Sequence, residues 1–372
     1  MAPESVSKCQ VCDKPATSVC GGCQSATYSH YYCSKACQKQ DWPYHKTSCI
    51  DLKIERVLIR VSTILLAAYL KFRENTWNMP IIKVEDDGRQ ELIIHRGSDN
   101  DKDYFLRFPA HLMKTTAIKN QVLCTSMCSE SIAWMHETIA GLLSGLNITI
   151  EELTTTLSSV PRYTTISHPN SLRHTNLPTT SHALVRITST ETGAQWAIDL
   201  SNAQFGIDQH LWRWAAYKAA YITRVVKIYP FGTHKELMRR QAQVCDLDCG
   251  LVGEVVAHMD RAVSAWQEEF KTPLRFLGSM GEGPTASAAA SLLACMQGAV
   301  SGFIRENDFT ERVRRGREYE VVHKGVRERE MGRVVGEFVK EREVLVGEEG
   351  MSADERADEF LRKLAEELEG EY

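Results

Sequence analysis

The amino-acid sequence predicts an α+β protein with a small cysteine-rich module, a mixed α/β body with β-hairpins, and a helical C-terminal region. Three observations support this prediction. Cysteines and a histidine form four close pairs near the N-terminus, apolar residues alternate around turn residues in the middle of the chain, and helical apolar spacing accompanies dense charge at its end. We expect the three parts to span residues 1–50, 51–275 and 276–372.

Length and composition indicate the broad class of the protein. A chain of 372 residues is long enough for two or three domains, and 43% hydrophobic and 25% charged residues are typical of a soluble globular protein. The net charge of −4 does not favour direct DNA binding. The N-terminus lacks the pattern of a secretory signal, so we expect reduced cysteines and a cytoplasmic or nuclear location.

The four pairs have the spacing of metal ligands. Thiolates and imidazoles bind zinc, and two of them separated by two or three residues can reach one ion. Four ligands complete a tetrahedral site, so eight ligands predict two zinc ions. A disulfide framework would leave a seventh cysteine unpaired and the histidine unexplained. The pairs are Cys9 and Cys12, Cys20 and Cys23, Cys33 and Cys37, and His45 and Cys49.

Residues 9–49 resemble a MYND-type zinc finger. The resemblance rests on the four pairs and on the stretches Tyr32–Gln38 and Asp41–Trp42. The resemblance implies that the pairs interleave, whereas spacing alone leaves sequential pairing open. One zinc ion would be held by Cys9, Cys12, Cys33 and Cys37, and the other by Cys20, Cys23, His45 and Cys49.

The resemblance also implies a function in protein interaction. MYND-type fingers generally bind short proline-containing peptides, and Gln38 and Trp42 match positions that line the peptide groove. For Trp42 the alternative is packing beneath the second zinc ion. Both sites would be saturated by protein ligands, which argues against zinc catalysis. We therefore expect a zinc-binding regulatory protein that captures a protein partner through such a peptide.

Two helices are predicted at the junction of the finger and the body. Cys33–Gln40 should form a short helix that is capped by Ser34 and ended by Pro43. Apolar residues then recur at helical spacing from Leu52 to Glu74, which predicts a helix that anchors the finger to the body.

The first half of the body contains one clear hairpin signal. Ile81–Val84 and Leu92–Ile94 flank Asp87 and Gly88, a typical turn pair. Residues 122–146 are expected to be largely helical. Residues 154–181 are rich in Thr, Ser, Pro and Asn, which predicts a long irregular connection.

Residues 182–200 predict a second hairpin with possible catalytic residues. Its turn would bring His182 and Asp199 together, since they become diagonal neighbours on one face. Cys124 or Cys128, at the start of a packed helix, would complete a Cys-His-Asp set. The expected cross-strand pairs are Ala183 with Leu200, Val185 with Ile198, and Ile187 with Trp196.

This order of cysteine, histidine and aspartate loosely resembles the transglutaminase-like and papain-like folds. The resemblance would imply an acyl-transfer or hydrolytic enzyme with a cysteine nucleophile as the alternative function. A buried free cysteine beside an edge histidine, or an inactive remnant of such a fold, explains the same residues. The sequence therefore leaves open whether the protein is an enzyme.

Other motifs have ordinary interpretations. Cys245 and Cys249 have a spacing that suits a metal and might join Cys124 and Cys128 in a third zinc site, but no pattern brings the four together. Lysine methyltransferases that combine a MYND finger with a SET domain were considered, but the Asn-His-Ser-Cys segment of that domain is absent.

The C-terminal region is expected to be helical. Residues 285–304 predict a buried helix rather than a membrane span, because small residues and Gln297 interrupt the apolar run. Ser352–Glu355 has the pattern of a capping box that opens a last helix. The sequence does not predict an oligomeric state.

Overall fold

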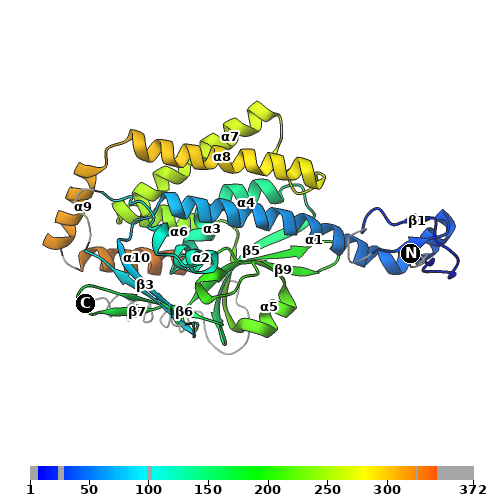
Figure 1. The fold of residues 1–372 in the computed structure, drawn as a ribbon, viewed down its shortest axis with the longest axis horizontal. Helices are drawn as coiled ribbons and strands as arrows, with labels where there is room; N and C mark the ends of the chain where they lie inside the picture. The colour runs from blue at the N-terminus through cyan, green and yellow to red at the C-terminus, as the bar shows by residue number, and fades with distance from the viewer. Residues whose placement is uncertain (1–6, 24–28, 87, 99–102, 324, 342–372) are drawn as a thin grey trace.

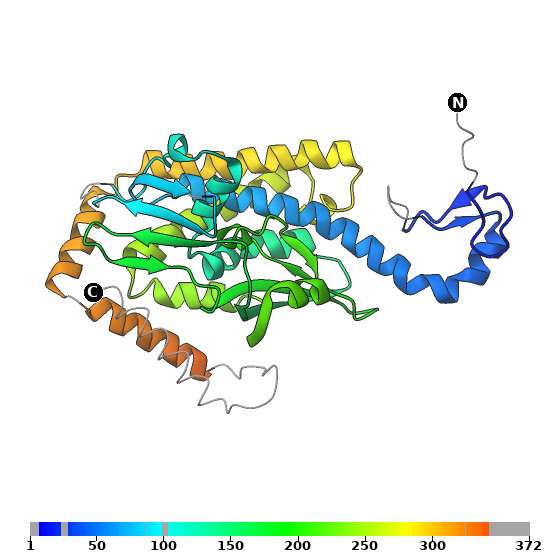
Figure 2. The ribbon, with the colours of Figure 1, turned by 60° about the horizontal axis from the view of Figure 1, so that its bottom comes forward.

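The computed structural model describes residues 7–23, 29–86, 88–98, 103–323 and 325–341, and its α+β class confirms the prediction. A body of two sheets and several helices is joined by the long helix α1 to a small N-terminal module with a sheet of its own (Figure 1). Figure 2 shows this module standing clear of the body at the far end of α1. The module contains the short strands β1 (Ser18–Val19) and β2 (Tyr31–Tyr32).

Helix α1, Lys35–Asn75, begins in the module and ends in the body. Ser34 caps it, since its hydroxyl accepts a hydrogen bond from the Cys37 N–H at 3.3 Å. The prediction that Pro43 ends the helix is wrong, because α1 continues through it. A proline removes one backbone hydrogen bond, and here the turns before and after it are held by cysteine and histidine clusters. From Ile54 onward its apolar stripe is buried in the body, as expected for an anchor.

The larger sheet of the body has the strand order β10-β9-β8-β5-β11, and all neighbours are antiparallel. Successive side chains of β8 point to opposite faces of the sheet. Val185 therefore packs in the main hydrophobic core on one face, and Leu184 packs in a smaller hydrophobic core on the other. The predicted pairs Val185–Ile198 and Ile187–Trp196 are present. The strands are β5 (Ile148–Leu157), β8 (His182–Ser189), β9 (Gln195–Ile198), β10 (Leu211–Arg213) and β11 (Ile222–Pro230).

The smaller sheet has the order β3-β4-β6-β7, in which β4 and β6 are parallel. Strands β3 (Ile81–Asp86) and β4 (Glu91–Arg96) form the first predicted hairpin. Residues 154–181 are not an irregular connection, because they contain the end of β5 and the strands β6 (Tyr163–Ser167) and β7 (Arg173–Thr175). Threonine is β-branched and favours strands, and the hydroxyls of Thr165 and Thr175 lie 2.9 Å apart across the β6–β7 pair.

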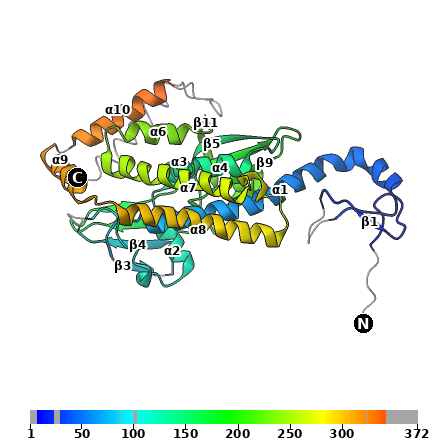
Figure 3. The same cartoon turned by 90° about the horizontal axis from the view of Figure 1, so that it is seen from above.

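Helices cover both faces of the larger sheet. Figure 3 shows α1, α7 and α8 running side by side, and their buried residues share the main core with α3 and α4. On the opposite face α5 packs over the smaller core. The helices of the body are α2 (Thr116–Cys124), α3 (Cys128–Trp134), α4 (His136–Leu143), α5 (Trp214–Tyr221), α6 (Thr233–Gln241) and α7 (Val252–Phe270), with short turns η1 (Ala110–Leu112), η2 (Asn202–Phe205), η3 (Asp246–Leu251) and η4 (Leu274–Phe276).

The C-terminal region contains α8 (Glu282–Glu306), α9 (Thr310–Val322) and α10 (Val326–Glu341). Helix α8 is not fully buried as predicted: Leu292, Met296 and Val300 face the core, whereas the opposite side is exposed. Within the described ranges α8 alone has the length and apolar composition to cross a membrane, which is weak evidence for a span. The predicted capping box and last helix lie outside the described residues.

Candidate metal centre

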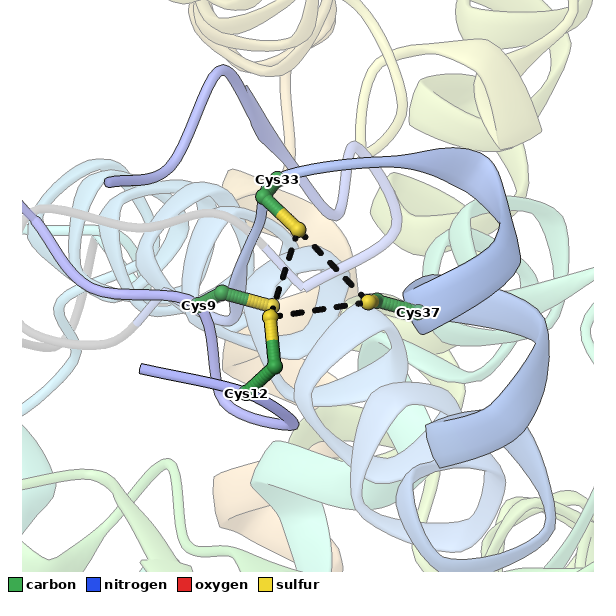
Figure 4. A group of neighbouring side chains, drawn as sticks. All are labelled: Cys9, Cys12, Cys33 and Cys37. Carbon is green, nitrogen blue, oxygen red and sulfur yellow. Dashed lines mark hydrogen bonds between the residues drawn. The ribbon is translucent and has the colours of Figure 1, made fainter. Parts of the chain in front are cut away.

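The first cluster is formed by the thiols of Cys9, Cys12, Cys33 and Cys37 (Figure 4). The Cys12 sulfur lies 3.4 Å from that of Cys33 and 3.9 Å from that of Cys37, and the latter two are 3.6 Å apart. Four sulfurs bound tetrahedrally at about 2.3 Å from one zinc ion would lie about 3.8 Å from one another. The observed spacing therefore fits a zinc ion. Two ligands come from the N-terminal turn, one follows β2, and Cys37 lies in the first turn of α1.

The second cluster is formed by Cys20, Cys23, His45 and Cys49, and all four side chains are buried. The Cys20 and Cys49 sulfurs are 3.7 Å apart, and the Cys23 sulfur is 3.3 Å from His45 Nε2. Helix α1 presents His45 and Cys49 on the same side, four residues apart. The two groups have the interleaved membership that the family resemblance implies, rather than the sequential one.

Ionisation of all the thiols in a cluster requires a cation, although backbone hydrogen bonds lower the pKa of Cys9 to about 6 despite its burial. Hydrogen bonds with the Cys12 and Cys37 thiols raise the pKa of Cys33 to about 12. Burial and the neighbouring Cys20 thiol raise the pKa of Cys49 to about 12. Because each thiolate opposes the next, the full set of thiolates becomes favourable only when a metal ion compensates the charge. Metal binding should therefore release protons.

Residues around the second cluster hold the His45 ring in place. Burial lowers the pKa of His45, which keeps the ring neutral and able to bind metal. The His30 ring stacks on it at 3.8 Å between centroids. Asp41 accepts a hydrogen bond from the Tyr32 hydroxyl at 2.7 Å and lies 3.3 Å from His30 Nδ1. Such a second layer orients a metal ligand.

Gly22 is required by the close approach of its backbone to the second cluster. A Cβ atom at this position would lie 2.7 Å from the Cys49 sulfur, closer than side-chain carbons approach other atoms. The Gly22→Ala variant should therefore lose zinc from the second site about tenfold faster, since it displaces one ligand. Release of zinc to a chromogenic chelator measures this rate. Gly21→Ala is the matched control, because its Cβ would meet nothing within 4 Å; equal rates in the two variants would contradict the prediction.

Gln38 and Trp42 lie four residues apart on one side of α1, and Trp42 contacts the second cluster. Trp42 meets the His45 ring edge-on, with 6.1 Å between centroids, and still exposes 40% of its surface. Gln38 is half-buried. The indole thus both packs against a metal-site histidine and presents an apolar surface to solvent.

The hairpin brings His182 and Asp199 together as predicted. His182 Nε2 lies 2.6 Å from Asp199 Oδ2, and both side chains are fully buried. Ala183 and Leu200 are not a strand pair, because β9 ends at Ile198. Both candidate cysteines lie nearby: the Cys128 sulfur is 3.9 Å from Ser181 O, and the Cys124 sulfur is 3.6 Å from Leu200 O.

Sequence reasoning missed two residues beside this pair. The Tyr217 hydroxyl donates to Asp199 Oδ2 at 2.7 Å, and Gln204 Nε2 lies 3.4 Å from His182 Nδ1. Tyr217 packs with Trp212 and Tyr221, and the roughly helical spacing of these aromatic residues predicts only a hydrophobic core. In the described part of the chain, every group of three or more possible metal ligands lies in the finger, so the suggested third zinc site is not formed.

Comparison with known proteins supports the identity of the N-terminal module. Residues 9–49 match the family model of the MYND finger. A stretch of 72 residues is 36% identical to "SET domain and MYND-type zinc finger protein 6" of Schizosaccharomyces pombe. That match covers 18% of this chain and 14% of the relative, so nothing about the relative's activity follows for this chain. No solved structure matches the chain. Residues 9–49 are therefore a MYND zinc finger, a domain generally involved in protein binding, and its two clusters fit two zinc ions.

Proposed function

We propose that this protein is a regulatory protein whose finger captures short proline-containing peptides of a protein partner. The observation that carries the proposal is the half-exposed Trp42 indole, held against the second zinc site on a helix that continues into the body. Both metal clusters are complete with protein ligands, so the zinc ions serve structure. None of the twelve cysteines forms a disulfide, which suits a reducing compartment such as the cytoplasm or nucleus.

The chemistry of this surface suits a proline-containing peptide. An indole face packs well against a pyrrolidine ring, and an extended proline-rich segment loses little conformational entropy when it binds. Gln38 lies one helical turn away, and its amide can donate to and accept from the backbone of such a peptide. In this proposal Trp42 is the anchor and Gln38 sets the peptide register.

Trp42→Ala should weaken binding about thirtyfold, since a tryptophan anchor contributes about 2 kcal/mol. The experiment uses the full zinc-loaded chain and a set of short fluorescent peptides with one or two prolines, each paired with a version in which alanine replaces proline. Fluorescence anisotropy gives the affinity of each peptide for the wild type and the variants.

Tyr44→Ala is the matched control. Tyr44 is 86% exposed and lies two residues from Trp42, so it faces another side of α1. The Tyr44→Ala variant should bind the peptides as tightly as the wild type does. Equal affinity of Trp42→Ala and wild type, or no preference for proline over alanine, would overturn the proposal. Loss of zinc from Trp42→Ala, measured in parallel, would instead assign Trp42 to packing at the metal site.

A further inference from the structure

Four lysines lie along one side of the first half of α1. Lys35, Lys39, Lys46 and Lys53 follow one another at intervals of four, seven and seven residues. Residues at these intervals share one face of an α-helix, because four and seven residues correspond to about one and two turns. All four side chains are exposed. Together they form a lysine stripe that covers about 27 Å of helix.

Trp42 belongs to the same face of α1. It follows Lys39 by three residues and precedes Lys46 by four, so its indole lies between these two lysines. Figure 2 shows this part of α1 between the finger and the body. The lysine stripe therefore extends to both sides of the residue that anchors the peptide in the proposed function.

No acidic side chain of α1 neutralises the lysine stripe. Every acidic residue between Lys35 and Arg56 points to another side of the helix and is held there by a donor outside α1. The pairs are Asp41 with Tyr32 at 2.7 Å, Asp51 with Thr192 at 2.5 Å, and Glu55 with Arg213 at 2.6 Å. Among the described residues, no carboxylate forms an ion pair with any of the four lysines.

Charged faces of the C-terminal helices are built differently. Arg314 on α9 and Arg333 on α10 each pair with one glutamate three residues before them and another four residues after them. Such a face mixes both signs and satisfies its own charges. The lysine stripe has one sign only, so it presents a positive potential to charged groups outside the chain.

Local helix energetics do not account for the first two lysines. Helix α1 begins at Lys35 and has no acidic residue in its first turn. Cations near a helix N-terminus meet the positive end of the helix dipole, and like charges four residues apart repel, so Lys35 and Lys39 destabilise the start of α1. Compensation of the first zinc cluster does not explain them either, since Cys37 lies on nearly the opposite side of the helix. A role in binding explains charges that the helix itself disfavours.

We propose that the peptide captured at Trp42 is acidic, with aspartates or glutamates on both sides of its proline. This inference rests on the proposed function of the finger and names the class of peptide that it takes. The ligand would contact the protein in two ways, through its proline ring on the indole and through its carboxylates on the lysine stripe.

The spacing of the lysine stripe sets where the acidic residues lie. Each residue of an extended proline-rich peptide covers about 3.1 Å, whereas each residue of α1 covers about 1.5 Å. Carboxylates about two and five residues from the proline on one side would meet Lys46 and Lys53. On the other side, carboxylates about one and three residues away would meet Lys39 and Lys35.

A nucleic acid suits this surface less well than an acidic peptide does. The chain as a whole carries a net charge of −4, which repels a long polyanion. An extended peptide is narrow enough to follow a single face of one helix. A single-stranded nucleic acid, which can stack a base on an indole, is the rival ligand that the experiment separates.

The experiment measures the affinity of short fluorescent peptides for the full zinc-loaded chain by anisotropy. One peptide has a pair of prolines flanked by aspartates, a second has asparagines in place of the aspartates, and a third keeps the aspartates but has alanines in place of the prolines. At about 50 mM salt the wild type should bind the aspartate peptide about tenfold more tightly than the asparagine peptide, because each exposed ion pair contributes a gain of about twofold. At about 500 mM salt this advantage should fall to about twofold.

Variants of the lysine stripe locate the effect. Lys39→Gln/Lys46→Gln should reduce the aspartate advantage to about threefold, since two of the four lysines remain. Lys71→Gln/Lys114→Gln is the matched control, because it removes the same charge from two exposed lysines of the body and should keep the full advantage. Lys39→Glu/Lys46→Glu should bind a peptide with lysines in place of the aspartates more tightly than the wild type does. Zinc content should be the same in all variants.

Four results would overturn the proposal. Equal affinity of the wild type for the aspartate and asparagine peptides at low salt would show that the lysine stripe is only a solvated face. Equal effects of the stripe variant and its control would show that net charge alone matters. Loss of zinc from the stripe variants would assign the lysines to the stability of the finger. A single-stranded oligonucleotide that displaces the aspartate peptide at a lower concentration than the unlabelled peptide does would assign the stripe to a nucleic acid.

Failure of this inference and failure of peptide capture are separate outcomes. If proline peptides bind through Trp42 equally well with and without aspartates, the finger captures peptides and only the acidic class is wrong. If binding depends on the aspartates and the lysine stripe but not on proline or Trp42, the charge recognition stands and capture through proline is wrong.

Discussion

Chelation of both zinc ions should unfold residues 9–49 while the body stays folded. The buried core of the finger consists of Cys9, Cys20, Cys23, Cys49 and Tyr32, so four of its five members are ligands. Its strands are two residues long each. An element of this size cannot bury enough apolar surface on its own, and structural zinc supplies about 10–16 kcal/mol of binding free energy in comparable peptides.

Amide hydrogen exchange, read before and after addition of a zinc chelator, measures this effect. Amides of the finger, including those of α1 between Lys35 and Cys49, should lose protection, whereas those from Ile54 onward should keep it, because the body core holds that part of the helix. Protection of the finger that survives complete zinc removal would contradict the prediction. Restoring zinc should restore protection, which controls for damage to the chain.

The second large effect is expected at Glu152 on β5. This carboxylate is fully buried and accepts three hydrogen bonds: from the Gly232 N–H at 2.7 Å, the His234 N–H at 2.8 Å and His234 Nδ1 at 2.6 Å. They tie β5 to the start of α6. Glu152→Gln brings an NH2 group among these donors, so it should destabilise the body by about 3–5 kcal/mol in chemical denaturation.

Glu151→Gln is the matched control on the neighbouring residue. Glu151 pairs with Arg186 at 2.9 Å but is 28% exposed, so its loss should cost less than about 1 kcal/mol. Similar destabilisation by the two variants would show that Glu152 has no special role. The comparison isolates burial, because both residues belong to the same strand and undergo the same chemical change.

The effect of Glu152→Gln should depend on pH. Burial acts to raise the pKa of Glu152, but the bonds from His234 and Gly232 outweigh it and lower the pKa below its ordinary value. The stability that a lowered carboxyl pKa contributes is fully present above the pKa of the unfolded state, about 4.3. It is lost as the pH falls through the lower pKa of the folded state. The difference in unfolding free energy between wild type and Glu152→Gln should therefore shrink below about pH 4.

What the sequence predicts well are local features. The zinc ligands can be predicted from the sequence because their spacing lets them bind one tetrahedral ion. The His182–Asp199 contact can be predicted from the sequence because the alternation of side chains along strands determines which residues of a hairpin are neighbours. In both cases the relevant partners lie within a few tens of residues along the chain.

Features that depend on contacts between residues far apart in the sequence cannot be predicted in this way. Gln204 and Tyr217 reach the His182–Asp199 pair from η2 and α5, and nothing in their own segments points to it. Gly22 reads as an ordinary turn residue until the Cys49 sulfur is seen beside it. Pro43 reads as a helix end because the clusters that hold the turns around it are formed by residues elsewhere in the finger.

The unbroken course of α1 also sets the direction in which the finger faces. Trp42 and Ile54, the first residue of the helix in the body core, are separated by twelve residues, which corresponds to about 18 Å of rise. A single residue inserted between them would turn the finger about its axis by about 100°, whereas seven would return it to within about 20° of its present heading. A ligand bound at Trp42 is thus held in a defined orientation relative to the body. Helix α1 fixes both the angle and the distance between the finger and the body.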